Sequence, residues 1–392
     1  MNFTMVFHYK KLGELVAIVG GGTPDRRKPH FWNGDINWIS VKDLVDDSIS
    51  SSLETITREG LEKSSAKLIP KGNIILPTRM ALGKVAINQI DVAINQDLKA
   101  LIIKDNSQLD LYYLFYFLKS KSSFIESKGK GATVKGITVS LISDLQIPLP
   151  PLTLQKKIAS ALGKAQELIN KRKAQIEALD QLTQSVFLEM FGDPVKNNKN
   201  WVMQKLSETG ELKRGISKYR PRNAPELLNG PYPLIQTGDV ANSGIFIKKY
   251  NQTYSELGLK QSKMWPKGTL CITIAANIAQ TGILTFDACF PDSVVAYIPK
   301  NYMSNIYVHF WFTFLQRIIE ANAPESAQKN INLKILSELE IPVPPVELQN
   351  KFVEIVEKIE SQKDLLQKSL EELENNFNSL MQRAFKGELF ND

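Results

Sequence analysis

The sequence predicts an α+β fold: two similar mixed α/β domains joined by two long antiparallel coiled-coil helices, in a pseudo-two-fold tandem duplication. The first observation is a repeat, because Ile147-Pro148-Leu149-Pro150-Pro151 returns as Ile341-Pro342-Val343-Pro344-Pro345, 194 residues further along. The second is that each copy precedes about forty residues whose apolar positions recur at steps of three and four. The predicted segments are residues 1–151 and 194–345 for the mixed domains, and 152–193 and 346–392 for the helices.

Each predicted helix follows a proline run, which keeps the chain extended and leaves Thr153 as the expected cap of the first helix. Nearly forty residues at 1.5 Å each give roughly 55–60 Å, too long for the interior of an ordinary domain. An apolar stripe of that length needs a partner helix. If the two stripes pair, the second helix returns antiparallel to the first and the C-terminus ends near the first domain.

The two mixed domains echo one another in the same order. Pro70-Lys71-Gly72 matches Pro266-Lys267-Gly268, and the apolar helix containing Tyr113–Leu118 matches Tyr307–Phe312. Alternating or apolar runs predict strands, which are Ile36–Val41, Asn73–Pro77, Gly83–Asn88 and Ala93–Lys104 in the first domain. The domains agree in framework and differ in loop content, as expected of two related readers on one spacer.

Composition indicates a soluble globular chain. The 392 residues are 43% hydrophobic and 23% charged, which suggests two to three domains. No apolar run approaches the ~20 residues that a bilayer requires, and no signal peptide is evident, so no membrane is expected. Cys271 and Cys289 lie in apolar runs and are predicted to be buried, reduced thiols of a cytoplasmic protein.

The net charge of +7 is unevenly distributed. Residues 1–151 carry 19 Lys and Arg against 15 Asp and Glu, or +4, and residues 194–345 carry 17 against 11, or +6. The first helical segment has +1 and the last has −4. This distribution favours contact of the two mixed domains with a polyanion and of the helices with protein, although such values are also ordinary for domains of this size.

The sequence contains no catalytic or metal-binding pattern. Its three histidines have no ligand spacing to one another or to the cysteines, and His309 is predicted to lie in the core. Gly129-Lys130-Gly131 lacks the order of a phosphate-binding loop. Recognition therefore remains as the predicted activity.

The candidate DNA contacts are loop residues that can neutralise phosphates or pair with base edges. In the first domain they are Thr23, Arg26, Arg27, Lys28, Ser40, Lys42, Arg79, Lys84, Lys128, Lys130, Thr133 and Lys135. In the second they are Lys213, Arg214, Ser217, Lys218, Arg220, Arg222, Gln236, Thr237, Asn277, Gln280, Gln328, Lys329 and Asn330. Lys135 and Lys329 stand at the same place in both copies. Trp38 and Trp265 are predicted to be core residues rather than base-stacking ones.

These motifs resemble the specificity subunits of type I restriction–modification systems. The resemblance covers essentially the whole chain and rests on Trp38–Leu44, Lys135-Gly136-Ile137 and the proline runs followed by Leu154-Gln155 and Leu348-Gln349. Two departures are visible: Leu154 and Leu348 stand where the family often has Glu, and the second domain lacks the Trp-Ile strand start.

The resemblance implies two target recognition domains, each reading one half of a bipartite, asymmetric site in double-stranded DNA. It implies that the helices set the half-site spacing and dock two methyltransferase subunits, with restriction subunits joining through the complex. It further implies a non-catalytic subunit without a cofactor of its own, because S-adenosylmethionine, ATP and Mg belong to the partners.

Two alternatives remain at this point. A single-chain nuclease or methyltransferase would need a cofactor or metal motif. A coiled-coil adaptor with two heads for non-DNA ligands would show no preference for DNA.

Overall fold

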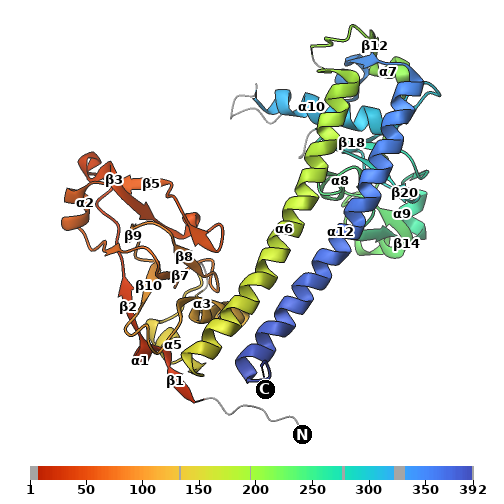
Figure 1. Ribbon diagram of the computed structural model, residues 1–392. Coiled ribbons are helices and arrows are strands. Elements are labelled where there is room, and N and C mark those ends of the chain that lie inside the picture. Colours follow the sequence, from red (N-terminus) through yellow and green to blue (C-terminus); the bar gives the residue numbers. More distant parts are fainter. Residues whose placement is uncertain (1–7, 132–133, 195, 276–278, 322–331, 391–392) are drawn as a thin grey trace. The chain divides into compact units, whose positions relative to one another are not determined.

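The computed structural model describes residues 8–131, 134–194, 196–275, 279–321 and 332–390 (Figure 1). The chain falls into two compact units. Unit 1 is Met1–Lys173 with Lys368–Asp392, and unit 2 is Ala174–Gln367. The two long helices, α6 (Leu152–Phe191) and α12 (Val346–Lys386), each contribute to both units.

The described residues of unit 1 form three sheets. The five-stranded sheet has the order β2 (Val16–Gly20), β10 (Leu98–Ile103), β7 (Ile74–Pro77), β8 (Ala86–Asn88) and β4 (Ser48–Ile49). The four-stranded sheet has the order β5 (Glu54–Ile56), β3 (Trp32–Ile39), β9 (Val92–Ile94) and β6 (Leu68–Ile69), and β1 (Tyr9–Lys11) pairs with β11 (Gln146–Pro148). The helices of this unit besides the long ones are α1 (Leu12–Leu15), α2 (Arg58–Glu62), α3 (Leu111–Ser120), α4 (Ser122–Ser127) and α5 (Val139–Ser143).

Unit 2 repeats this order strand for strand. Its five-stranded sheet is β13 (Gly210–Arg214), β21 (Val294–Pro299), β18 (Leu270–Thr273), β19 (Thr281–Leu284) and β15 (Phe246–Ile247). Its four-stranded sheet is β16 (Gln252–Tyr254), β14 (Leu228–Leu234), β20 (Ala288–Cys289) and β17 (Met264–Trp265), and β12 (Val202–Lys205) pairs with β22 (Glu340–Val343). The shorter helices are α7 (Leu206–Thr209), α8 (Thr237–Ala241), α9 (Glu256–Lys260), α10 (Asn305–Ala321) and α11 (Leu333–Glu338). The predicted α+β tandem duplication is therefore confirmed.

The helices α6 and α12 contact each other in both units, and in unit 2 they run antiparallel, as the paired stripes predict. In unit 1 Lys173 pairs with Glu374 at 2.8 Å. In unit 2 Asp180 pairs with Lys363 at 2.5 Å and the Phe187 ring lies 5.5 Å from that of Phe352, so residue numbers fall along α12 where they rise along α6. The rings of Tyr113 in α3 and Phe385 in α12 lie 5.3 Å apart, which places the C-terminal end of α12 in the unit of the first mixed domain.

Aromatic side chains bind the apolar helix of unit 2 to the long helices. Phe187 of α6 stacks on Tyr307 and Phe310 of α10, with centroids 5.6 and 5.9 Å apart, and packs edge-on against Phe352 of α12 at 5.5 Å. All four rings belong to one buried cluster that also contains sheet residues such as Ile272. Sheet, α10 and the helix pair therefore share a single core.

A buried glutamine fastens each mixed domain to its long helix. The Gln155 side chain accepts a hydrogen bond from the Asp110 N–H at 2.9 Å and donates to the carbonyls of Gln108 and Pro150 at 2.8 and 2.9 Å. Gln349 repeats the arrangement with Ser304, Tyr302 and Pro344. Both glutamines are fully buried.

Two local predictions need correction. Thr153 does not cap α6, because the helix begins at Leu152 and the carbonyl of Pro151 accepts from the Leu154 and Gln155 N–H groups. The strand expected over Ala93–Lys104 is two strands, β9 and β10, separated by the turn Asn95–Asp97. The predictions for Trp38 and Trp265 are confirmed, since they are 3% and 1% exposed.

Replacing Gln155 with Met tests the glutamine clamp. The substitution keeps most of the volume but leaves the buried Pro150 bond and the part-buried bonds to Asp110 and Gln108 unmade, which should cost about 2–4 kcal/mol. Hydrogen exchange at the start of α3 should accelerate accordingly. Gln382→Met, on an exposed position of α12 in the same unit, is the control. A loss below about 0.5 kcal/mol in Gln155→Met would contradict the structural role assigned to the clamp.

Candidate nucleic-acid interface

In unit 1, the ends of several strands meet at one polar corner. The Asn95 N–H bonds to the Ile39 carbonyl at 3.0 Å, the Gly22 N–H to Ile94 at 2.9 Å, and the Thr78 N–H to Asp97 at 2.7 Å. These bonds bring the loops after β2, β3, β7 and β9 together. We call the set corner one; it comprises Gly21–Thr23, Ser40, Thr78–Arg79, Asn95–Asp97, Lys130 and Lys135–Gly136.

The side chains of corner one form a connected polar chain. The Thr23 hydroxyl donates to Gln96 Oε1 at 2.5 Å, and Arg79 approaches Asp97 Oδ1 at 3.6 Å. Asp97 is 7% exposed, and its Oδ1 accepts no hydrogen bond from the described residues. A buried acceptor without a donor is costly unless a ligand supplies one.

Lys99, which was not among the predicted DNA contacts, binds the turn of corner one that contains Gln96. Lys99 Nζ donates to the carbonyls of Gln96 and Leu98 at 2.9 and 3.0 Å. Burial lowers the pKa of Lys99, and the Asp97 carboxylate opposes that shift. The lysine thus fixes the turn that presents Gln96.

Unit 2 builds an equivalent corner from equivalent strands. The Gly215 N–H bonds to the Val294 carbonyl at 2.8 Å, Ile235 to Cys289 at 2.8 Å, and Ile274 to Ser293 at 3.0 Å. Corner two comprises Gly215–Arg222, with Arg214 beside it, Gln236–Thr237, Thr273–Ala275, Gln280 and Pro291–Ser293.

Glycine is required where each corner turns. A Cβ on Gly21 would lie 1.9 Å from the Ile94 carbonyl oxygen, and one on Gly215 would lie 2.3 Å from that of Pro291. Real Cβ atoms do not approach so closely, so both loops depend on the missing side chain. The two glycines stand 194 residues apart, in the register of the repeat.

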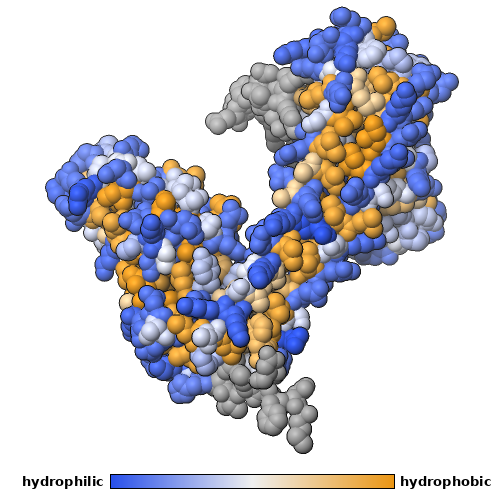
Figure 2. All heavy atoms as spheres, viewed as in Figure 1, coloured by the Kyte–Doolittle hydropathy of each residue, from blue (hydrophilic) through white to orange (hydrophobic). Residues whose placement is uncertain are grey.

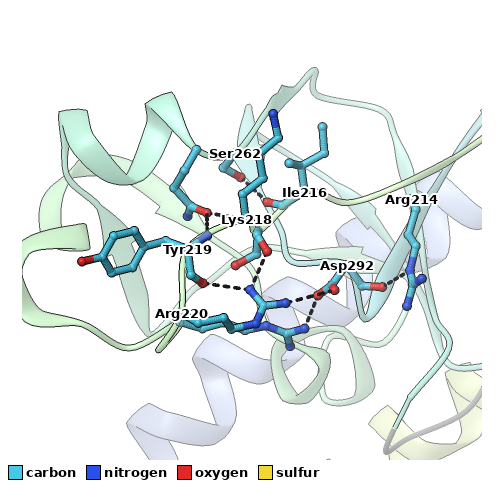
Figure 3. A network of polar contacts seen from close by, with 10 residues as sticks. Arg214, Ile216, Lys218, Tyr219, Arg220, Ser262 and Asp292 are labelled. Atoms are coloured by element: carbon cyan, nitrogen blue, oxygen red, sulfur yellow. Dashed lines mark hydrogen bonds and ion pairs between the residues drawn. The ribbon is translucent and has the colours of Figure 1, made fainter.

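Asp292 organises corner two (Figure 3). Its side chain pairs with Arg220 at 3.4 Å and with Arg222, and its backbone carbonyl accepts from Arg214 Nε. Arg220 also donates to the carbonyls of Ser217 and Tyr219 at 2.6 and 2.8 Å.

A second set of contacts holds the same loop from the other side. Gln261 Oε1 accepts from the Lys218 and Tyr219 N–H groups at 2.7 and 3.1 Å, and the Ser262 hydroxyl donates to the Ile216 carbonyl at 2.8 Å (Figure 3). The loop is therefore preorganised, although most of its side chains are exposed.

The structure brings together only part of the predicted set. Thr23, Ser40, Arg79, Lys130 and Lys135 lie in corner one, and Arg214, Ser217, Lys218, Arg220, Arg222, Gln236, Thr237 and Gln280 lie in or beside corner two. Thr133, Asn277, Gln328, Lys329 and Asn330 fall outside the described residues.

Other predicted residues have local roles away from these contacts. Arg26 lies 3.8 Å over the Trp32 ring and pairs with Glu54, and Arg27 lowers the pKa of Asp25 to about 2 through its hydrogen bonds. The remaining members are exposed or engaged nearby: Lys28 over Phe31, Lys42 in a 3₁₀ turn, Lys84 on the Leu44 carbonyl, Lys128 over Phe124 and Lys213 beside Glu211.

The described residues contain no group of three His, Cys, Asp or Glu side chains able to hold a metal ion. Among the described helices, none has the length and apolar character needed to traverse a bilayer. His309 is buried as predicted, with Nδ1 2.9 Å from the Thr281 hydroxyl, and burial lowers its pKa to about 4. Both cysteines are buried free thiols, and burial raises their pKa values.

Comparison with known proteins now identifies the class. The family model for the type I restriction modification DNA specificity domain matches residues 7–178 and again 198–375. The chain therefore belongs to this family, with two copies of its domain, and the resemblance stated from the sequence is confirmed.

Individual specificity subunits of type I restriction enzymes are also similar to this chain. The MjaIX type I restriction enzyme specificity subunit of Methanocaldococcus jannaschii is 28% identical over 273 residues, 65% of this chain and 62% of the relative. The EcoR124I/EcoR124II subunit of Escherichia coli is 36% identical over 41% of each chain, and the EcoBI subunit is 25% identical over 82% of this chain and 76% of the relative. The matched stretches thus span less than two thirds of the first two relatives.

Solved structures show the same fold. The S subunit of a type I restriction-modification system from M. genitalium aligns with a TM-score of 0.56 at 18% identity, covering 98% of this chain and 97% of that one. A chain from a study of assembly and conformational transition in the type I R-M system aligns with a TM-score of 0.61, also at 18% identity, covering 98% of both chains.

The buried His309 gives a pH test of unit 2. Its pKa is lower in the folded chain than the usual 6.5, so unfolding binds a proton between pH 6.5 and about 4. Stability from this group is present above pH 6.5 and is lost as the pH falls, by on the order of 3 kcal/mol. Denaturant unfolding of His309→Gln should show a shallower decline than the unsubstituted chain. Parallel curves for the two proteins would mean that the imidazole titrates normally.

Proposed function

We propose that this chain is the DNA-specificity subunit of a type I restriction–modification complex, in which corner one and corner two each read one half of a bipartite, asymmetric DNA site. The observation that carries the proposal is the pair of corners: identical strand order frames both, yet the side chains at equivalent places differ. A repeated frame with divergent polar contents suits two readers of different sequences.

The chemistry of both corners suits duplex DNA. Exposed cations such as Arg79, Lys135 and Lys218 can neutralise phosphates, while amide and guanidinium groups can pair with base edges. The excess charges of +4 and +6 on residues 1–151 and 194–345 favour the same partner. The preorganised backbone limits the ordering cost of binding.

The long helices supply surface for protein partners. Figure 2 shows apolar residues along the visible face of α6 and α12 in unit 2. On the parts of these helices that belong to unit 2, Leu182, Leu188 and Leu365 are 47%, 41% and 65% exposed. A continuous apolar stretch on a surface marks an interaction site, whereas single exposed leucines do not. We assign the stretch on α6 and α12 to two methyltransferase subunits, with restriction subunits joining through the complex, and the helices to setting the half-site spacing.

In this proposal the subunit contributes recognition alone. S-adenosylmethionine, ATP and Mg are bound by the partner subunits, and the complex works in the cytoplasm. The adaptor with non-DNA ligands loses its basis, because the matching family is defined by DNA specificity. The single-chain nuclease or methyltransferase has no observation in its favour.

Exchanging one domain tests the bipartite reading. Replacing residues 194–345 with the corresponding segment of a family member that recognises another sequence should change one half of the methylated motif and preserve the other. Methylation mapping in cells that carry the partner subunits reads both halves at once. A change in both halves, or in neither, would refute the assignment of one half to each domain.

Removing a cation from corner one tests the interface. Lys135→Ala in the assembled complex should weaken binding about equally to all DNA sequences and reduce the slope of log K against log salt by about 1. Lys71→Ala is the matched control, because Lys71 is exposed near the opposite end of β7. Equal effects of the two substitutions would place the DNA elsewhere on unit 1.

A further inference from the structure

The two corners differ at the turn that precedes β10 in unit 1 and β21 in unit 2. Gln96 and Asp292 occupy equivalent places there, because the strands they precede begin at Leu98 and Val294 and pair with β2 and β13 in matching register. The carbonyl of each residue accepts a hydrogen bond from a cation, Lys99 in one case and Arg214 in the other. The backbone arrangement is the same at both positions, but the side chain is acidic only in corner two, where Asp292 stands in the place of Gln96.

The three arginines around Asp292 differ in how many of their N–H donors are already hydrogen-bonded. Arg220 donates to two backbone carbonyls and to Asp292 Oδ2, so three of its five N–H groups are committed within the loop. Arg220 therefore fixes the path of residues 217–220, and its role as a DNA contact stays a prediction.

Arg222 and Arg214 keep most of their donors. Among the described residues, Arg222 donates through one N–H to Asp292 Oδ1, and Arg214 donates through Nε to the Asp292 carbonyl. Four N–H groups remain on each, and the terminal nitrogens of Arg214 point away from Asp292 (Figure 3). The side chain of Arg222 is 44% exposed, so its guanidinium is oriented and still open to a ligand.

An oriented guanidinium with free paired donors matches the major-groove edge of guanine, whose O6 and N7 both accept. A guanidinium can also bind a phosphate through two donors, so the charge around it has to separate the two ligands. A carboxylate that is 27% exposed also lowers the local positive charge, which disfavours a purely electrostatic role.

We infer that Asp292 is the specificity-determining positioning residue of unit 2 and that it aims Arg222, supported by Arg214, at a guanine in the half-site read by corner two. Corner one has Gln96 and Thr23 at this place and reads its half-site by other chemistry. The inference rests on the proposed function, since it names the base that this same interface recognises.

The test uses the complete complex with its partner subunits and the variants Arg222→Lys and Asp292→Asn. Lysine keeps the charge but lacks the planar pair of donors. We expect Arg222→Lys to bind the recognised site about 10- to 100-fold more weakly and to leave binding to unrelated DNA within about threefold. One guanine position in the half of the motif assigned to residues 194–345 should become degenerate in methylation mapping.

The variant Asp292→Asn distinguishes a role in positioning Arg222 from a role in folding. It removes a negative charge, so binding to unrelated DNA should be unchanged or stronger, while preference for the guanine is lost. A merely structural defect would weaken binding to every sequence. Lys300→Ala is the control, because Lys300 directly follows β21 at the end remote from corner two, and it should leave the motif intact.

Each contrary result has a distinct meaning. A wild-type complex without any bipartite motif would overturn the proposed function itself. A bipartite motif that Arg222→Lys leaves unchanged, an equal loss on specific and unrelated DNA, or a half-site of A·T pairs alone would overturn the guanine assignment and leave the proposed function standing.

Discussion

The structure depends on a buried hydrogen-bonded clamp between each mixed domain and its long helix. Gln155 and Gln349 lie in the first turn of α6 and α12. Each accepts from one backbone N–H and donates to one carbonyl just before α3 or α10, and it donates to a second carbonyl in the proline run before its own helix. Because a buried polar group without a partner costs stability, these bonds fix the orientation of each long helix relative to its mixed domain. Within each unit, the polar corner is consequently held in a fixed relation to the segments of α6 and α12 that belong to that unit.

This rigid frame explains how the corners can diverge. The strand order that frames corner one and corner two is equivalent, the Thr78 bond to Asp97 matches the Ile274 bond to Ser293, and both corners turn at a glycine that no other residue could replace. The side chains that project from the frame are under no such constraint. Gln96 with Thr23 in one copy and Asp292 with its arginines in the other occupy the same scaffold. Specificity can therefore change without disturbing the fold.

The sequence predicted the architecture because repeats and apolar stripes are local, periodic signals. Both proline runs, the apolar helices and the start of each long helix were visible in this way. The partners of the recognition loops were less visible, because Gln96, Asp292 and Gln261 act through contacts between residues distant in the sequence. The break at Asn95-Gln96-Asp97 was the one available signal, since three polar residues interrupt an apolar strand pattern. The hydrogen bonds by which Arg220 fixes its own loop were equally invisible, because they form only once residues 217–220 are folded.

Hydrogen–deuterium exchange of the assembled complex, with and without DNA carrying its methylated motif, tests the assignment of the two corners most directly. Binding should slow exchange at Gly21–Thr23 and Asn95–Asp97 in unit 1 and at Gly215–Arg222 in unit 2, and DNA with one half-site scrambled should protect one corner only. Protection around Lys71 or Lys267, with both corners unchanged, would contradict the assignment.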